Sequence, residues 1–120
     1  MDRLSQRYQI IIDIINGDKD LILSKKKIEF FLRNITNLIG MQIIAGPYIA
    51  EGNFSNGGLS AFVIIDFSHI SVHTFLNKNS VLIDIFSCKK FDRKKAIRFS
   101  QKFFGVKKEY LHTKNVSWDK

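Results

Sequence analysis

The sequence predicts an α+β fold, a two-layer arrangement in which one antiparallel sheet carries helices on a single face. β-branched and aromatic residues gather in several short runs of strand length. Two longer segments instead repeat their apolar residues at the spacing of an amphipathic helix. Because these segments follow one another as strand, helix, several strands, helix and strand, we expect the helices to form a separate layer.

The size of the chain predicts one domain over residues 1–120. A chain of 120 residues with 45% hydrophobic content can bury one core but has no room for a second. Its sequence has no apolar run of about 18 residues that could cross a membrane, and polar residues follow Met1 where a signal peptide would have its core. We therefore expect a cytoplasmic protein without a membrane partner.

The first strand is predicted over residues 8–15, a nearly continuous β-branched run of the kind found in a strand covered on both faces or at a dimer seam. Turn residues follow at 16–18. Ser24 is a predicted N-cap, and Gly40 ends the helix that it begins. The apolar positions of this helix form one stripe: Ile28, Phe31, Leu32, Ile35, Leu38 and Ile39.

Four further strands are predicted over 42–49, 59–67, 70–75 and 80–87. Gly46-Pro47 marks the end of the first of these, a polar loop covers 51–58, and 77–79 form a turn. Asp92 is the predicted N-cap of a second helix that Gly105 terminates. Residues 106–116 then add an edge strand, where lysines discourage pairing with another sheet.

The positive charge is confined to the C-terminal part of the chain. Residues 1–88 hold eight basic and eight acidic residues, whereas 89–120 hold eleven basic against three acidic, which accounts for the net charge of +8. Such a bias can attract nucleic acid. No recognition motif or stacking aromatics accompany these lysines, so the pattern favours a solvated helix face and tail over a nucleic-acid partner.

Nucleophiles and bases concentrate in residues 66–74, followed by the single cysteine of the chain, Cys88. His69 and His73 would share a face of a helix, but β-branched residues alternate between them, and in a strand they lie about 13 Å apart. That separation excludes a common metal ion, and partner ligands at usual spacings are missing, so no metal site is predicted.

Nucleophilic catalysis is the other chemistry that these residue types allow. Asp66, Ser68 and His73 are the types of a hydrolase triad, but the Gly-x-Ser-x-Gly elbow is absent and the chain is too short for an α/β-hydrolase. A thiol protease pairing Cys88 with His73 has no supporting motif. From the residues alone, Cys88 is either a packing residue or a reactive thiol.

Two strings in this region carry a family resemblance. Residues 67–74 read FSHISVHT and residues 81–88 read VLIDIFSC. Together they resemble the signature of the small prokaryotic S-adenosylmethionine decarboxylase proenzymes, a likeness that extends from the strand at 8–13 to the helix after Cys88. The resemblance implies the same two-layer fold, a homodimer formed through the open sheet faces, and a self-processing decarboxylase of spermidine biosynthesis.

The resemblance also implies how the enzyme matures. Ser68 would attack the carbonyl of Phe67, and the chain would then be cut between these two residues into a β chain, 1–67, and an α chain, 68–120. Ser68 would become a covalent pyruvoyl group, the cofactor of the reaction. His73 matches the processing histidine of the family, and Ser60 matches its assisting serine.

In the mature enzyme, the pyruvoyl ketone would condense with the amine of an amino-acid-type substrate and accept the electrons released with carbon dioxide. Cys88 matches the family's proton donor. Phe54 matches an aromatic residue that stacks on adenine. Asn77 stands where the family places a glutamate that binds the ribose hydroxyls.

The sequence departs from the family at two positions. Phe67 replaces the glutamate that usually precedes the serine, and Phe75-Leu76-Asn77 replaces Trp-Pro-Glu. An asparagine lacks the charge that strengthens hydrogen bonds to a ribose. Three hypotheses therefore remain: decarboxylation of S-adenosylmethionine, decarboxylation of a basic amino acid such as ornithine or arginine, and an unprocessed homologue that binds a ligand or nucleic acid.

Overall fold

The computed structural model describes residues 6–52 and 57–116, and it confirms the predicted α+β class. Its strands are β1 (Tyr8–Ile14), β2 (Ile43–Glu51), β3 (Gly57–Ile65), β4 (Ser68–Phe75), β5 (Ser80–Ser87) and β6 (Leu111–Val116). Its helices are α1 (Lys19–Ile22), α2 (Lys25–Leu38) and α3 (Arg93–Phe104), with 3-10 turns η1 (Asn77–Asn79) and η2 (Lys108–Tyr110).

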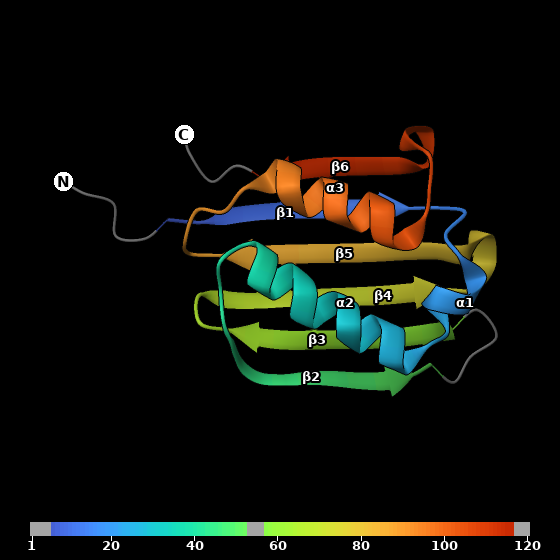
Figure 1. Cartoon of the computed structure of the whole chain (residues 1–120), viewed down its shortest axis with the longest axis horizontal. Coiled ribbons are helices and arrows are strands. Elements are labelled where there is room, and N and C mark those ends of the chain that lie inside the picture. Colours follow the sequence, from blue (N-terminus) through green and yellow to red (C-terminus); the bar gives the residue numbers. More distant parts are fainter. Residues whose placement is uncertain (1–5, 53–56, 117–120) are drawn as a thin grey trace.

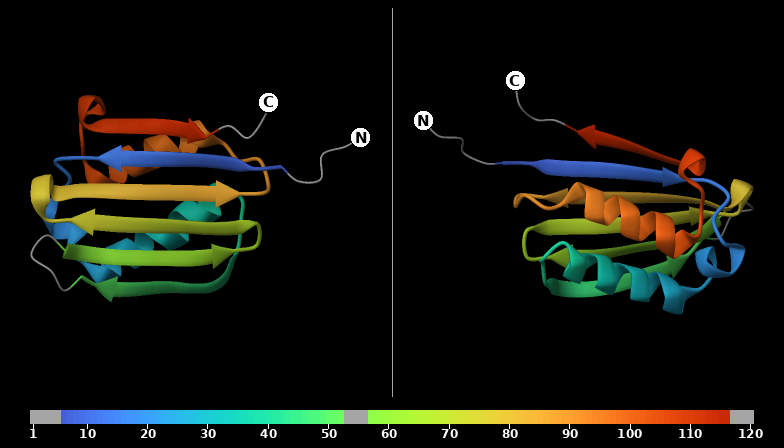
Figure 2. Two further views of the ribbon diagram at one scale, coloured as in Figure 1. Left: turned by 180° about the vertical axis from the view of Figure 1, so that it is seen from behind. Right: turned by 45° about the horizontal axis from the view of Figure 1, so that its top comes forward.

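The six strands form one antiparallel sheet in the order β2-β3-β4-β5-β1-β6. The helices α2 and α3 lie on one face of this sheet, and the opposite face carries none (Figures 1 and 2). As predicted, β6 is an edge strand, although it begins at Leu111, after η2. Neighbouring hairpins place β3, β4 and β5 side by side at the centre, where the candidate residues lie.

Both long helices begin and end as the sequence predicts. Ser24 Oγ accepts a hydrogen bond from the Lys27 N–H at 3.1 Å, and Asp92 Oδ1 accepts one from the Lys95 N–H at 3.1 Å. Gly105 ends α3 in the left-handed conformation (φ 65°), which costs a glycine no steric strain. The caps thus satisfy N–H groups that a helix end leaves without a partner.

The core lies between the helices and the covered face of the sheet. Alternate residues of the strands point into it, including Ile10, Ile12 and Ile14 of β1. The Phe31 side chain of α2 is fully buried and packs against three rings of α3, those of Phe99, Phe103 and Phe104, at 5.2–5.5 Å between centroids. These contacts join the two helices above the core.

Gly46-Pro47 does not end a strand, contrary to the prediction. β2 continues through a cis Gly46-Pro47 bond to Glu51, with register shifts on either side of Ala45. Proline is tolerated because β2 is an edge strand, so its missing N–H removes no bond to a further strand. A bulge at this position absorbs the extra residues.

The turn between β3 and β4 also lies earlier than predicted. Residues 66 and 67 are a two-residue turn and not the end of a strand, and β4 begins at Ser68 instead of Ile70. The turn is anchored at Asp66, whose N–H donates to Gln42 O at 3.0 Å and whose Oδ1 accepts from Gln42 N–H at 3.1 Å. Phe67 therefore lies in a tight turn directly before Ser68.

Candidate active site

Ser68 is the first residue of β4 and pairs with residues of both neighbouring strands, Ile65 of β3 and Ser87 of β5. The carbonyl oxygen of the preceding residue, Phe67, accepts a hydrogen bond from the backbone N–H of Cys88 at 2.9 Å. A donor in this position polarises the carbonyl toward attack at its carbon. The two residues that the sequence analysis assigned to the cut and to proton donation, Ser68 and Cys88, are thus brought to one end of the sheet.

Cys88 follows β5 in a sharp turn that the sequence analysis did not identify as functional. The hydroxyl of Ser87 is fully buried; it donates to the Lys89 carbonyl at 2.7 Å and accepts from the Lys89 N–H at 2.8 Å. A side chain that bonds to backbone two residues later is a typical serine turn. The Cys88 side chain is left exposed, as a reactive thiol must be.

Ser60 and His73 form a second pair at the other end of β4. They are opposite each other on β3 and β4, and Ser60 Oγ and His73 Nδ1 are 2.9 Å apart, a hydrogen bond. This bond occupies Nδ1, so Nε2 is the ring nitrogen left for proton transfer. The antiparallel register thus accounts for a pair that is thirteen residues apart in the sequence.

The end of the sheet that holds Ser60 and His73 is fixed by the residue after the histidine. Thr74 Oγ1 is buried, accepts from the Leu59 N–H at 2.8 Å and donates to the Ile22 carbonyl at 2.8 Å. A Cβ on Gly58 would lie 2.5 Å from the carbonyl oxygen of Thr74, so only glycine fits there. These contacts join α1, β3 and β4 and hold the backbone beside His73 in place.

Within one chain, Ser68 and Cys88 lie far from Ser60 and His73. His73 lies five positions after Ser68 along β4, and at about 3.3 Å per residue their backbones are about 16 Å apart. A proton cannot pass directly from one side chain to the other over such a distance. The family resemblance implies that His73 assists Ser68, and the fold of a single chain does not provide that contact.

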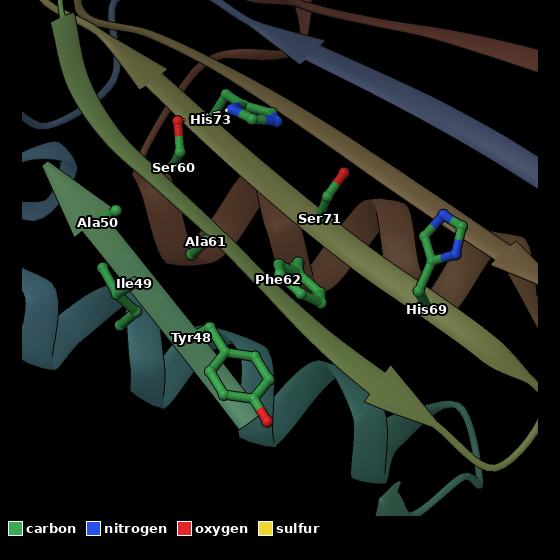
Figure 3. Close-up of a pocket in the computed structure, with 9 residues that line it drawn as sticks. All are labelled: Tyr48, Ile49, Ala50, Ser60, Ala61, Phe62, His69, Ser71 and His73. Carbon is green, nitrogen blue, oxygen red and sulfur yellow. Dashed lines mark hydrogen bonds between the residues drawn. The ribbon is translucent and has the colours of Figure 1, made fainter. Parts of the chain in front are cut away.

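A cavity of 410 Å³ opens on the uncovered face of the sheet (Figure 3). Ser60 and His73 lie at one end of it and His69 at the other, with the Tyr48 and Phe62 rings, 5.3 Å between centroids, along its side. Its walls are mainly apolar, with a few polar groups from β3 and β4, as is usual for a small-molecule site.

Of the two predicted substrate-binding residues, only Asn77 can be located. Phe54 lies outside the described residues, and Asn77 is exposed in η1, directly after β4. Within residues 6–52 and 57–116, no three His, Cys, Asp or Glu side chains gather as a metal site would require. None of the helices in these ranges has the length and apolar character needed to cross a bilayer.

The sequence model of S-adenosylmethionine decarboxylase matches residues 8–115, nearly the whole described chain. This chain belongs to the S-adenosylmethionine decarboxylase family. The matched range contains Ser60 and His73, which are hydrogen-bonded to each other, and Ser68 and Cys88, which lie at one end of the sheet. The family membership that the sequence analysis inferred from the strings around Ser68 and Cys88 is therefore confirmed.

Individual members of the S-adenosylmethionine decarboxylase family match at low identity over most of their length. A proenzyme of this name from Pyrococcus furiosus is 28% identical over 110 residues, which are 91% of this chain and 76% of the relative. The proenzyme from Clostridium botulinum strain Langeland is 28% identical over 102 residues, 84% of this chain and 85% of the relative. The fold agrees with the crystal structure of adenosylmethionine decarboxylase from Aquifex aeolicus, with a TM-score of 0.72, 18% identity and 97% coverage of both chains.

Proposed function

We propose that this protein is a proenzyme that cuts itself before Ser68 and then decarboxylates S-adenosylmethionine through the resulting pyruvoyl group. The observation that carries the proposal is the hydrogen bond from the Cys88 N–H to the Phe67 carbonyl. This carbonyl belongs to the Phe67–Ser68 peptide bond, the bond at which the family resemblance places the cut. The hydrogen bond supplies an oxyanion donor at the one carbonyl where self-cleavage needs it. Family membership over residues 8–115 provides the reaction class.

Self-cleavage begins when Ser68 Oγ loses its proton and attacks the Phe67 carbonyl carbon. The negative charge that develops on the Phe67 oxygen faces the Cys88 N–H, 2.9 Å away in the uncut chain. When the C–N bond breaks, the nitrogen takes up a proton and an ester joins Phe67 to the Ser68 side chain. Loss of the Ser68 α-proton then expels Phe67 as a carboxylate. Water finally replaces the amino nitrogen of residue 68, which leaves as ammonia and gives the ketone.

The pyruvoyl ketone supplies an electron sink for a substrate amine and its carboxyl group. The Cys88 side chain is exposed beside Phe67 and can return a proton to the substrate carbon once carbon dioxide has left. Tyr48 and Phe62 offer aromatic surface in the cavity near Ser60 and His73, which suits an adenine ring. These features support a nucleoside-bearing substrate.

The proposal includes a homodimer in which each active site draws on both chains. Four apolar side chains of β2 and β3 are well exposed although they belong to regular strands: Ile44, Tyr48, Phe62 and Ile64, at 39–65%. Apolar side chains clustered on one sheet face are typical of a surface that another molecule covers. A second copy would cover the same patch on both partners, as in most symmetric dimers.

The position of the two pairs favours one symmetry for this dimer. A two-fold axis in the interface and perpendicular to the strands reverses their direction in the partner. The Ser68 end of one β4 then lies over the His73 end of the other. Ser68 and His73 are about 16 Å apart within a chain, but this symmetry would bring Ser68 of one chain close to His73 of the other. Each Ser68 would then use the partner's His73 as its base.

Purified protein should release labelled carbon dioxide from carboxyl-labelled S-adenosylmethionine, and far less from labelled ornithine or arginine at equal concentration. The basic amino acids are the second candidate because Asn77 brings no charge to a ribose. Release of carbon dioxide from ornithine or arginine alone would be consistent with the pyruvoyl chemistry but would contradict S-adenosylmethionine as the substrate. Release from none of the three would contradict the enzymatic proposal.

Cys88→Ala separates cleavage from decarboxylation. Alanine keeps the backbone N–H that faces Phe67 but removes the thiol, so we expect the chain to be cut while turnover falls by about 100-fold or more. The measurement is carbon dioxide release per mole of pyruvoyl group. Lys90→Ala, two residues along the same exposed turn, is the matched control and should retain turnover. Full decarboxylation by Cys88→Ala would exclude the thiol as proton donor.

A further inference from the structure

The turn Ser87–Lys89 contacts the residue on the acyl side of the bond to be cut in two independent ways. The Cys88 N–H binds the Phe67 carbonyl at 2.9 Å, and the Lys89 Nζ lies 5.2 Å from the centroid of the Phe67 ring. The hydrogen bond restrains the Phe67 carbonyl, and the cation–π contact restrains the Phe67 side chain. Phe67 itself is 39% exposed, so the fully buried core does not hold its ring in place.

Ser87 restrains this turn through its side chain. Its hydroxyl bonds to both the N–H and the carbonyl of Lys89, at 2.8 and 2.7 Å, in a fully buried position. The two bonds close a ring around Cys88, whose N–H donates to the Phe67 carbonyl one residue beyond the antiparallel pair of Ser68 and Ser87. Without the hydroxyl, the turn loses both restraints, and the N–H and carbonyl of Lys89 each lose a hydrogen-bond partner.

We infer that Ser87 and Lys89 are positioning residues for self-cleavage: Ser87 aims the Cys88 N–H at the scissile carbonyl, and Lys89 holds the Phe67 ring by a cation–π contact. This inference rests on the proposed self-cleavage and adds to it two residues that do not touch the reacting atoms. The inference also gives a role to Phe67, which replaces the glutamate usual in the family. Its aromatic ring can bind the Lys89 ammonium although it has no carboxylate.

The test follows the rate of self-cleavage of freshly translated full-length chain by denaturing electrophoresis. We expect Ser87→Ala to slow cleavage by about 10- to 100-fold, since small displacements of reacting groups have effects of this order. Lys89→Gln should slow self-cleavage by about 2- to 5-fold, as expected for loss of an exposed cation–π contact. The separate variant Lys89→Arg keeps the cation and should cleave at the rate of the unchanged protein. Lys90→Gln is the matched control for Lys89 and should cleave normally.

A second control separates positioning from simple destabilisation. Ser100 is as buried as Ser87, and its hydroxyl bonds to Ala96 O within α3, so Ser100→Ala removes a comparable group far from the turn. It should lower the melting temperature without slowing cleavage. Hydroxylamine cuts esters and therefore detects any chain held at the ester between Phe67 and the Ser68 side chain. Because Ser87→Ala should impair formation of this ester and not the later elimination, hydroxylamine should release no more fragment from this variant than from the unchanged protein.

The outcomes separate the two proposals. If the unchanged chain never cleaves, the proposed function fails. If it cleaves and Ser87→Ala or Lys89→Gln cleaves at the same rate, only the positioning inference is overturned. A Ser87→Ala chain that collects as ester, detected by hydroxylamine, would also overturn it, since the turn would then act after the acyl shift.

Discussion

Replacing Ser68 by alanine should leave one uncut chain of residues 1–120 without decarboxylase activity. The variant lacks the hydroxyl that attacks Phe67, so neither the ester nor the pyruvoyl ketone can form. We expect activity to disappear and not merely to decline, because the substrate amine then has no ketone to bind. Intact mass under denaturing conditions and carbon dioxide release from carboxyl-labelled S-adenosylmethionine measure both effects.

Ser80→Ala is the matched control for this experiment. Ser80 begins the neighbouring strand β5, and its hydroxyl donates only to the nearby Asn77 carbonyl at 3.1 Å. We expect this variant to be cut and active. A Ser68→Ala chain that is still cut after Phe67 would contradict the assignment of the nucleophile.

Mixing two inactive variants should restore cleavage in one of the two chains. Ser68→Ala alone has no nucleophile, and His73→Ala alone has no base. In the proposed mixed dimer, the intact Ser68 of the His73→Ala chain would meet the His73 of the Ser68→Ala chain. The His73→Ala chain should therefore be cut, and the Ser68→Ala chain should stay whole.

The variants are co-expressed with different tags, so that each chain is followed separately on a denaturing gel. His112→Ala in place of His73→Ala is the control for the loss of a histidine, because His112 is exposed on the edge strand β6, and it should cleave without help. If the mixed sample shows no cleavage in either chain although mixed dimers form, each Ser68 depends on its own chain. The shared-site geometry would then be wrong.

The fold could be predicted from the sequence largely because its signals are local. Ser24, Asp92 and Gly105 cap their helices through bonds within a few residues, and the strand at 80–87 matches β5 in full. The errors arose where position in the sheet decides. Pro47 reads as a strand end, yet an edge strand tolerates it. The four-residue α1 is too short to produce a helical pattern.

The candidate site was predictable in its residue types but not in its grouping. Ser60, Ser68, His73 and Cys88 could be identified from the strings that carry the family resemblance. Strand register decides which of them meet: it joins Ser60 to His73 and brings Cys88 to Phe67. Register between strands is a long-range property. The contact between Lys89 and Phe67 across two turns could not be predicted for the same reason.

The most direct test of the central claim is the mass of the unmodified protein under denaturing conditions, combined with a hydrazine reagent that labels ketones. Self-cleavage predicts two fragments, 1–67 and 68–120. Only the second should react with hydrazine and resist sequential degradation from its N-terminus. A single chain of 120 residues that does not react with hydrazine, found in protein that decarboxylates S-adenosylmethionine, would contradict the pyruvoyl mechanism.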